Sequence, residues 1–160
     1  MKLRAHFAEY LGTALITATV VGSGIMAQVL TRDVLLQLLV NTFATVLILA
    51  LAIWLLAPVS GAYFNPAVLL IAFIRRQVSA LELLTLTLVQ VAGAASGAIL
   101  AHALFNRTLI DPSATARDGS WLFLSEVVAT AGLVATIFIA SNQGRGDNAF
   151  WLVPLWIGGA

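Results

Sequence analysis

A short polar break between two apolar stretches is the part of this sequence best suited to chemistry. Residues 60–67 read Ser-Gly-Ala-Tyr-Phe-Asn-Pro-Ala, and residues 68–74 are all apolar. Asn65 is a favoured helix N-cap, and Pro66 suits the first helical position, where its missing N–H would be unpaired anyway. The start of such a helix carries about half a positive charge, which repels cations, while the Asn65 amide can donate to water or a hydroxyl. This chemistry suits small neutral polar solutes.

The apolar stretch after the break is too short to cross a membrane. Residues 66–74 form a run of nine, which reaches about 14 Å as a helix, half of a ~30 Å bilayer core. We therefore expect a re-entrant half-helix. Non-helical backbone at membrane depth is tolerated only where protein buries it or water lines it, which favours a pore over an ordinary Asn-Pro loop turn.

Composition places the rest of the chain in a membrane. It is 61% hydrophobic and 9% charged, whereas soluble domains carry about 25% charged residues. Four apolar segments are long enough to span, and a fifth begins near residue 149; the four are 7–30, 34–56, 81–105 and 121–140. The first segment is too long for a signal-peptide core, so we expect a retained helix. The net charge of +1 gives no indication of a nucleic-acid partner, and the absence of cysteine excludes disulfides and thiolate metal sites.

The charged connections predict one orientation. With 66–74 re-entrant, five basic residues lie on one side and three on the other; they are Lys2, Arg4, Arg75, Arg76 and Arg145 against Arg32, Arg107 and Arg117. The positive-inside rule then predicts a cytoplasmic N-terminus in a multi-pass plasma-membrane protein. We expect Arg75 and Arg76 to anchor the end of the half-helix at the headgroups. Pro112 and Ser113 predict a turn in the longest connection, 106–120.

Two glutamates stand in apolar segments, and a weak internal repeat relates them. Glu9 matches Glu126 at an offset of 117, with four further identities: Thr13, Ala14, Ala18 and Thr19 match Thr130, Ala131, Ala135 and Thr136. We predict one membrane domain over 1–160, with a first repeat over 1–105 and a partial, inverted second repeat over 119–160. Glu9 is interpreted as a brace; interfacial placement and a proton relay remain alternatives. Gly93 and Gly97 predict close helix packing.

Segment 60–69 resembles the signature of the aquaporin (major intrinsic protein) family, Ser-Gly-Ala-His-x-Asn-Pro-Ala-Val-Thr, with Tyr63 and Leu69 in place of histidine and threonine. Three further segments resemble starts or cores of family helices: 8–13 reads Ala-Glu-Tyr-Leu-Gly-Thr, 90–94 reads Gln-Val-Ala-Gly-Ala and 125–130 reads Ser-Glu-Val-Val-Ala-Thr. The resemblance, to a bacterial type, covers the chain in order. It implies an all-α integral membrane bundle with inverted repeats, and a homotetramer with one pore per subunit.

The resemblance also implies roles for individual residues. Asn65, Pro66 and Ala67 would form the first of two pore motifs, and Gly61, Ala62 and Tyr63 would present carbonyls to the pore. Glu9 and Gln90 would brace the first re-entrant loop and Glu126 the second, while Thr45 would lie near the outer constriction. A small hydroxyl at Thr45 would leave room for solutes larger than water.

The sequence predicts a passive channel for water or small neutral solutes such as glycerol or metalloid acids. Residue 160 falls before the second motif, so we expect a C-terminally incomplete channel. A non-conducting half-protein and a secondary transporter with broken helices are the alternatives; the transporter requires coupling acids near the break, and residues 57–75 contain none. No enzyme, cofactor or metal chemistry is indicated. We expect the lipid bilayer and a small neutral solute as partners.

Overall fold

A computed structural model describes residues 2–111 and 118–160, and the regular structure in these residues is entirely helical. The elements are α1 (Lys2–Leu30), α2 (Val34–Ser60), α3 (Pro66–Ile74), α4 (Ala80–Leu104), α5 (Ser120–Asn142), the 3₁₀ turn η1 (Gly146–Asn148) and α6 (Ala149–Gly159). Within the described residues, four helices are long and apolar enough to cross a membrane, namely α1, α2, α4 and α5. The expected all-α membrane class is confirmed.

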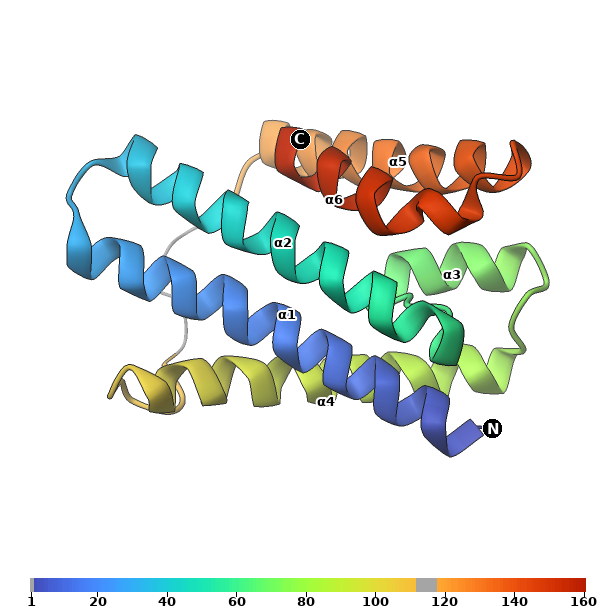
Figure 1. Ribbon diagram of the computed structural model, residues 1–160, viewed down its shortest axis with the longest axis horizontal. Coiled ribbons are helices and arrows are strands. Elements are labelled where there is room, and N and C mark those ends of the chain that lie inside the picture. Colours follow the sequence, from blue (N-terminus) through green and yellow to red (C-terminus); the bar gives the residue numbers. More distant parts are fainter. Residues whose placement is uncertain (1, 112–117) are drawn as a thin grey trace.

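The path of the chain makes α3 a re-entrant element (Figure 1). Helix α1 runs the length of the bundle and α2 returns to the end where the N-terminus lies. Helix α3 then begins part-way along the bundle and runs back to that same end, from which α4 crosses again. A helix of nine residues reaches only about 14 Å. The short apolar run 66–74 therefore forms a half-helix that enters the bundle and leaves at the same end, as the hydropathy pattern predicts.

Small residues allow α1 and α4 to approach closely. A Cβ at Gly97 would lie 2.2 Å from the carbonyl oxygen of Ala14, and a Cβ at Gly93 would lie 2.5 Å from that of Tyr10. Both distances are shorter than any real contact, so only glycine fits there. The predicted small-residue packing face is confirmed.

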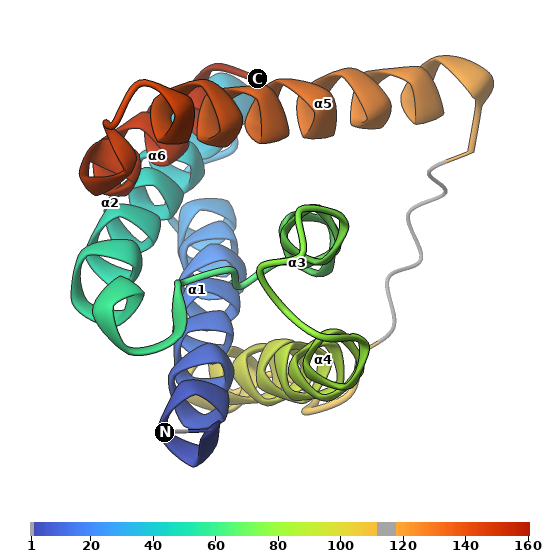
Figure 2. The same ribbon diagram turned by 90° about the vertical axis from the view of Figure 1, so that its right-hand side faces the viewer.

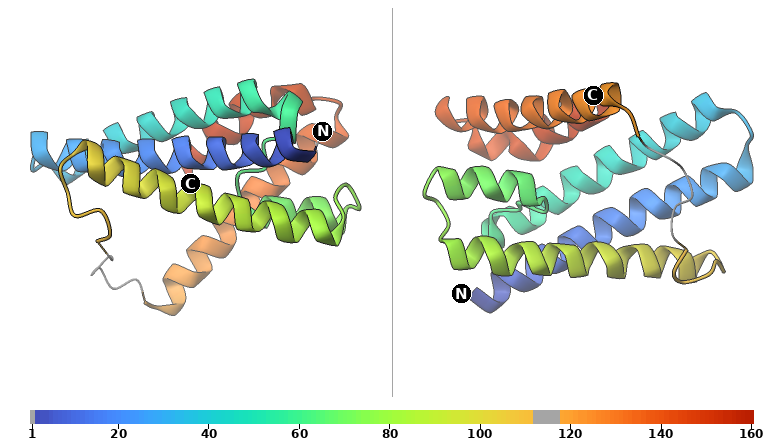
Figure 3. Two further views of the ribbon diagram at one scale, coloured as in Figure 1. Left: turned by 90° about the horizontal axis from the view of Figure 1, so that it is seen from below. Right: turned by 180° about the vertical axis from the view of Figure 1, so that it is seen from behind.

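The second half of the chain packs on the first through α6. Helix α6 contacts α2 and α5, and the Trp156 indole donates a hydrogen bond to the Ala129 carbonyl at 3.0 Å. Helix α5 runs obliquely to the other long helices (Figure 3). Seen along the bundle, α3 lies between α4 and α5 (Figure 2). The half-helix is thus flanked by elements from both halves of the sequence.

Two expected boundaries differ from the structure. Helix α1 starts at Lys2 instead of residue 7, and α2 continues through Pro58 to Ser60 instead of ending at residue 56. Proline removes the hydrogen bond to the carbonyl four residues earlier, but so close to a helix end only one bond is lost. The predicted turn at Pro112 and Ser113, and Arg117, lie outside the described residues.

Candidate functional site

The connection between α2 and α3 is tightly bent. Gly61, Ala62 and Phe64 have φ values of 93°, 52° and 50°, all in the left-handed region. The connection does not begin as an extended segment: Ser60 is the last residue of α2, and Gly61 caps it in the left-handed conformation. Left-handed backbone costs about 1–2 kcal/mol for a residue other than glycine. Ala62 and Phe64 therefore need contacts that hold them in place.

The carboxylate of Glu9 supplies these contacts. Its Oε1 accepts from the Ser60 hydroxyl at 2.6 Å and from the Tyr63 N–H at 3.0 Å. Its Oε2 accepts from the Phe64 N–H at 2.8 Å and from the Gln90 side-chain amide at 2.8 Å. The Ser60 hydroxyl also accepts from the Ala62 N–H at 3.0 Å. One side chain on α1 thereby joins the end of α2, the bent connection and α4.

The surroundings of Glu9 decide between its alternative interpretations. Its exposed fraction is 0%, so the interfacial placement was wrong. Each carboxylate oxygen faces two donors, which uses the four lone-pair positions that an ionised carboxylate offers. A protonated acid would have to donate from one of these oxygens, to each of which a backbone N–H already donates, and the Ser60 hydroxyl or the Gln90 amide would have to turn to accept. The geometry therefore favours a fixed carboxylate over a proton relay.

Gln90 is buried beside Glu9, with 1% of its surface exposed. Its amide nitrogen donates to Glu9, while its Oε1 has no hydrogen-bond partner among the described residues. An unpaired buried acceptor costs free energy. Among the described residues, the hydrogen bond to Glu9 is thus the one that orients the Gln90 side chain.

A second contact, between Phe64 and Gly12, positions the bent connection. The Phe64 ring is buried on α1, where a Cβ at Gly12 would lie 2.1 Å from its Cε1 atom. Neither residue was among the site residues predicted from the sequence. The available signal was spacing, because Gly12 lies one helical turn after Glu9, on the same face of α1.

The start of α3 has the expected cap. Asn65 has extended backbone (φ −143°, ψ 125°), its Oδ1 accepts from the Ala67 N–H at 2.8 Å, and Pro66 occupies the first turn. The other half of the Asn65 amide, the NH₂ group, has no partner within residues 2–111 and 118–160 and is left to donate. Leu69 is fully buried, which fixes α3 against its neighbours.

A cavity of about 350 Å³ opens beside this cap. The residues that line it come from α1, α2, the bent connection, α3, α5, η1 and α6; those from the connection are Gly61, Ala62, Tyr63, Phe64 and Asn65. Thr45 of α2 lines the same cavity, and its hydroxyl donates to the Asn41 carbonyl at 2.8 Å. Of the predicted pore residues, Gly61, Ala62, Tyr63, Asn65 and Thr45 line this one cavity, whereas Pro66 and Ala67 do not line it.

Glu126 is not brought to this site. It is exposed on α5 and borders a separate hollow with Ile71 and Thr130. No hydrogen bond of its side chain is found in the described part of the chain. The two matched glutamates thus have different surroundings here.

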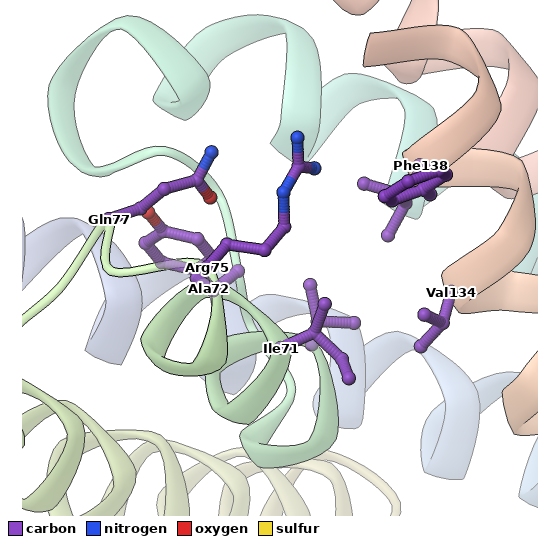
Figure 4. A pocket seen from close by; sticks show the side chains of 9 residues that line it. Ile71, Ala72, Arg75, Gln77, Val134 and Phe138 are labelled. Carbon is purple, nitrogen blue, oxygen red and sulfur yellow. The ribbon is translucent and has the colours of Figure 1, made fainter. Parts of the chain in front are cut away.

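The two arginines that follow α3 also differ from each other. The Arg75 guanidinium carbon lies 5.1 Å from the centroid of the Phe138 ring on α5, and the side chain is half-buried. Arg76 is exposed. The Arg75 side chain is turned toward α5 (Figure 4), and the expected anchoring of both arginines at the headgroups stays a prediction.

Together, these features define a multi-pass membrane protein whose re-entrant half-helix is held at a cavity by a buried carboxylate. The sequence model of the family described as Major intrinsic protein matches residues 1–160, and the chain belongs to that family. Proteins of this family are channels and not enzymes.

Two curated relatives share substantial sequence with the chain. Aquaglyceroporin AqpS of Rhizobium meliloti (strain 1021) is 45% identical over 154 residues, which cover 96% of this chain and 66% of AqpS. Aquaporin-1 of Botryotinia fuckeliana (strain B05.10) is 31% identical over 108 residues, covering 66% of this chain and 23% of that protein. The chain thus spans less than two thirds of the length of either relative.

Proposed function

We propose that the complete protein encoded by this gene is a passive channel for water and small neutral solutes. The observation that carries the proposal is the opening of the capped start of α3 onto the 350 Å³ cavity. The positive end of the helix dipole and the free Asn65 NH₂ group meet any solute there. Cations are repelled, while water and hydroxyl groups find a donor.

Glu9 has an indirect role in this proposal. It does not line the cavity; it fixes Tyr63 and Phe64, which do. Two left-handed residues held by a buried carboxylate give the lining a single shape. A channel that selects by hydrogen-bond geometry requires such a rigid lining, because a loose one would also admit ions with part of their hydration shell.

We propose glycerol-sized solutes in addition to water. AqpS, with which this chain shares 45% identity, is named an aquaglyceroporin. Thr45 supports the assignment, because a threonine at the cavity wall leaves more space than an aromatic ring would. Its hydroxyl oxygen can also accept from a solute hydroxyl while its hydrogen remains bonded to Asn41.

The assembly and orientation are part of the same proposal. We place the N-terminus, the α3–α4 connection and the α5–α6 connection in the cytoplasm of a plasma-membrane protein, because these connections carry most of the basic residues. A homotetramer with one pore per subunit is proposed from the family resemblance. We further propose that 1–105 and 119–160 belong to two inverted repeats, and that Glu126 supports a second re-entrant segment as Glu9 supports the first.

Stopped-flow light scattering of proteoliposomes tests the function. Vesicles with the complete protein should shrink faster than empty vesicles in a sucrose gradient, and they should re-swell faster in glycerol. Thr45→Phe should lower glycerol permeability more than water permeability, with Thr45→Ser as the matched control. Equal rates for empty and protein-containing vesicles would refute the channel; an unchanged glycerol rate in Thr45→Phe would refute the role of Thr45 alone.

A further inference from the structure

A second, smaller pocket lies between α3 and α5. Its volume is about 50 Å³, and its walls come from the α3 side and from α5. Figure 4 shows Arg75 and Gln77 on one side of the space, with Val134 and Phe138 facing them from α5. The lining extends along α3, from Tyr63 and Val68 near its start to Arg75 and Gln77 at its end, and Asn65 does not line this pocket.

The polar wall of this pocket is formed by Arg75, Tyr63 and Gln77. Arg75 offers five N–H groups and no acceptor, while the Tyr63 hydroxyl and the Gln77 amide can each donate or accept. The Arg75 guanidinium carbon lies 5.1 Å from the centroid of the Phe138 ring, within the ~6 Å range of a cation–π contact. No hydrogen bond of the Arg75 side chain is found among the described residues, and those that line the pocket include no acid, so its N–H groups can donate to a solute.

The opposite wall is apolar. Val68 and Ile71 of α3 and Val134 and Ile137 of α5 contribute only aliphatic side chains. A water needs roughly 10–15 Å³ of such volume, so the pocket has room for a few water-sized groups. A small polyol matches these walls, because its hydroxyl edge can face Arg75 and its carbon edge the aliphatic side chains.

The small pocket adjoins the large cavity. Tyr63, Val68 and Ile137 line both spaces. A solute that leaves the cavity toward this end of α3 therefore passes between the half-helix and α5. We propose that Arg75, Tyr63 and Phe138 form a second solute-selecting site, specific for a small polyhydroxy solute. The proposal rests on the proposed channel function.

The test compares glycerol and water permeability of the complete protein in proteoliposomes. Arg75→Gln removes the charged, planar guanidinium group, and Phe138→Leu removes the aromatic ring that this group contacts. Each should lower the glycerol-to-water permeability ratio by about two- to fivefold, the range expected for losing one cation–π contact. Arg76→Gln is the matched control, since it removes the same charge one residue away on an exposed side chain; its ratio should equal that of the wild type.

The outcomes separate this site from the channel itself. A wild-type protein that conducts neither solute refutes the channel, and this site with it. A conducting wild type whose ratio is unchanged, or raised, in Arg75→Gln and Phe138→Leu overturns the site and leaves the channel intact. Altered formate permeability with unchanged glycerol permeability overturns the polyol assignment in favour of an anion. If Arg75→Gln fails to assemble, Phe138→Leu with its water permeability as the folding control decides alone.

Discussion

The contribution of Glu9 can be tested by replacing its carboxylate with an amide of the same shape. In Glu9→Gln one oxygen becomes an NH₂ group, which must point either at Phe64 and Gln90 or at Ser60 and Tyr63. In the first case the Gln90 amide can rotate and accept, and in the second the Ser60 hydroxyl can rotate and accept. Either way one backbone N–H, of Phe64 or of Tyr63, loses its acceptor.

The magnitude follows from these contacts. A buried donor left unpaired costs about 1–3 kcal/mol, and hydrogen bonds to a neutral acceptor are weaker than those to a charged one. We therefore expect Glu9→Gln to lower the free energy of unfolding by about 2–4 kcal/mol. Glu9→Ala leaves four donors unpaired and should exceed about 4 kcal/mol, the range of exceptional single substitutions.

Denaturant titration of the complete protein in mixed micelles measures this change, and water permeability of the same variants in proteoliposomes shows whether the cavity lining is lost with it. Asp147→Asn is the matched control, because it removes one carboxylate from an exposed turn and should change stability by less than about 0.5 kcal/mol. If Glu9→Gln matched this control in both stability and permeability, the bracing of the bent connection by Glu9 would be wrong.

Three further predictions concern close packing and the helix cap. Gly12→Ala should displace the Phe64 ring and lower water permeability, whereas Gly24→Ala, whose Cβ would lie 3.5 Å from its nearest neighbour, should keep wild-type permeability. Gly97→Ala should push α1 from α4 and lower the unfolding free energy by about 1–3 kcal/mol, again with Gly24→Ala as control; equal stability of the two variants would contradict the close approach. Asn65→Asp keeps the oxygen that caps α3 but adds a negative charge at the start of this helix. The variant should fold normally and raise cation leakage, measured with a potential-sensitive dye. Unchanged leakage would argue against charge repulsion at Asn65.

The helices and the half-helix could be predicted because local properties of the sequence determine them. Hydropathy and length mark α1, α2, α4 and α5 as spans and α3 as too short to span. The residue types at the start of α3 predict its cap without further information. The resemblance to the family could be recognised from the same short segment, because its residues are unusual in an apolar chain, and the match over residues 1–160 shows the membership.

The shape of the connection could not be predicted because it depends on a side chain far away in the sequence. The left-handed conformation of Phe64 is held by Glu9 directly, and that of Ala62 through the Ser60 hydroxyl, which Glu9 binds; Glu9 lies more than 50 positions earlier. Similarly, the local charge pattern around Arg75 does not indicate that its guanidinium lies over the Phe138 ring of α5. Both features arise from tertiary contacts that no local pattern records.

The central claim is that one face of α3 lines a conducting path, and thiol labelling tests it most directly. The 160 residues contain no cysteine. In a background in which any cysteine elsewhere in the complete protein has been replaced, Val68→Cys, at the cavity, and Leu70→Cys, on α3 but outside the cavity lining, can be labelled selectively. Water flux through Val68→Cys proteoliposomes should fall after treatment with a methanethiosulfonate reagent and recover with reductant, while Leu70→Cys keeps its flux. Full labelling of Val68→Cys without loss of flux would contradict the claim.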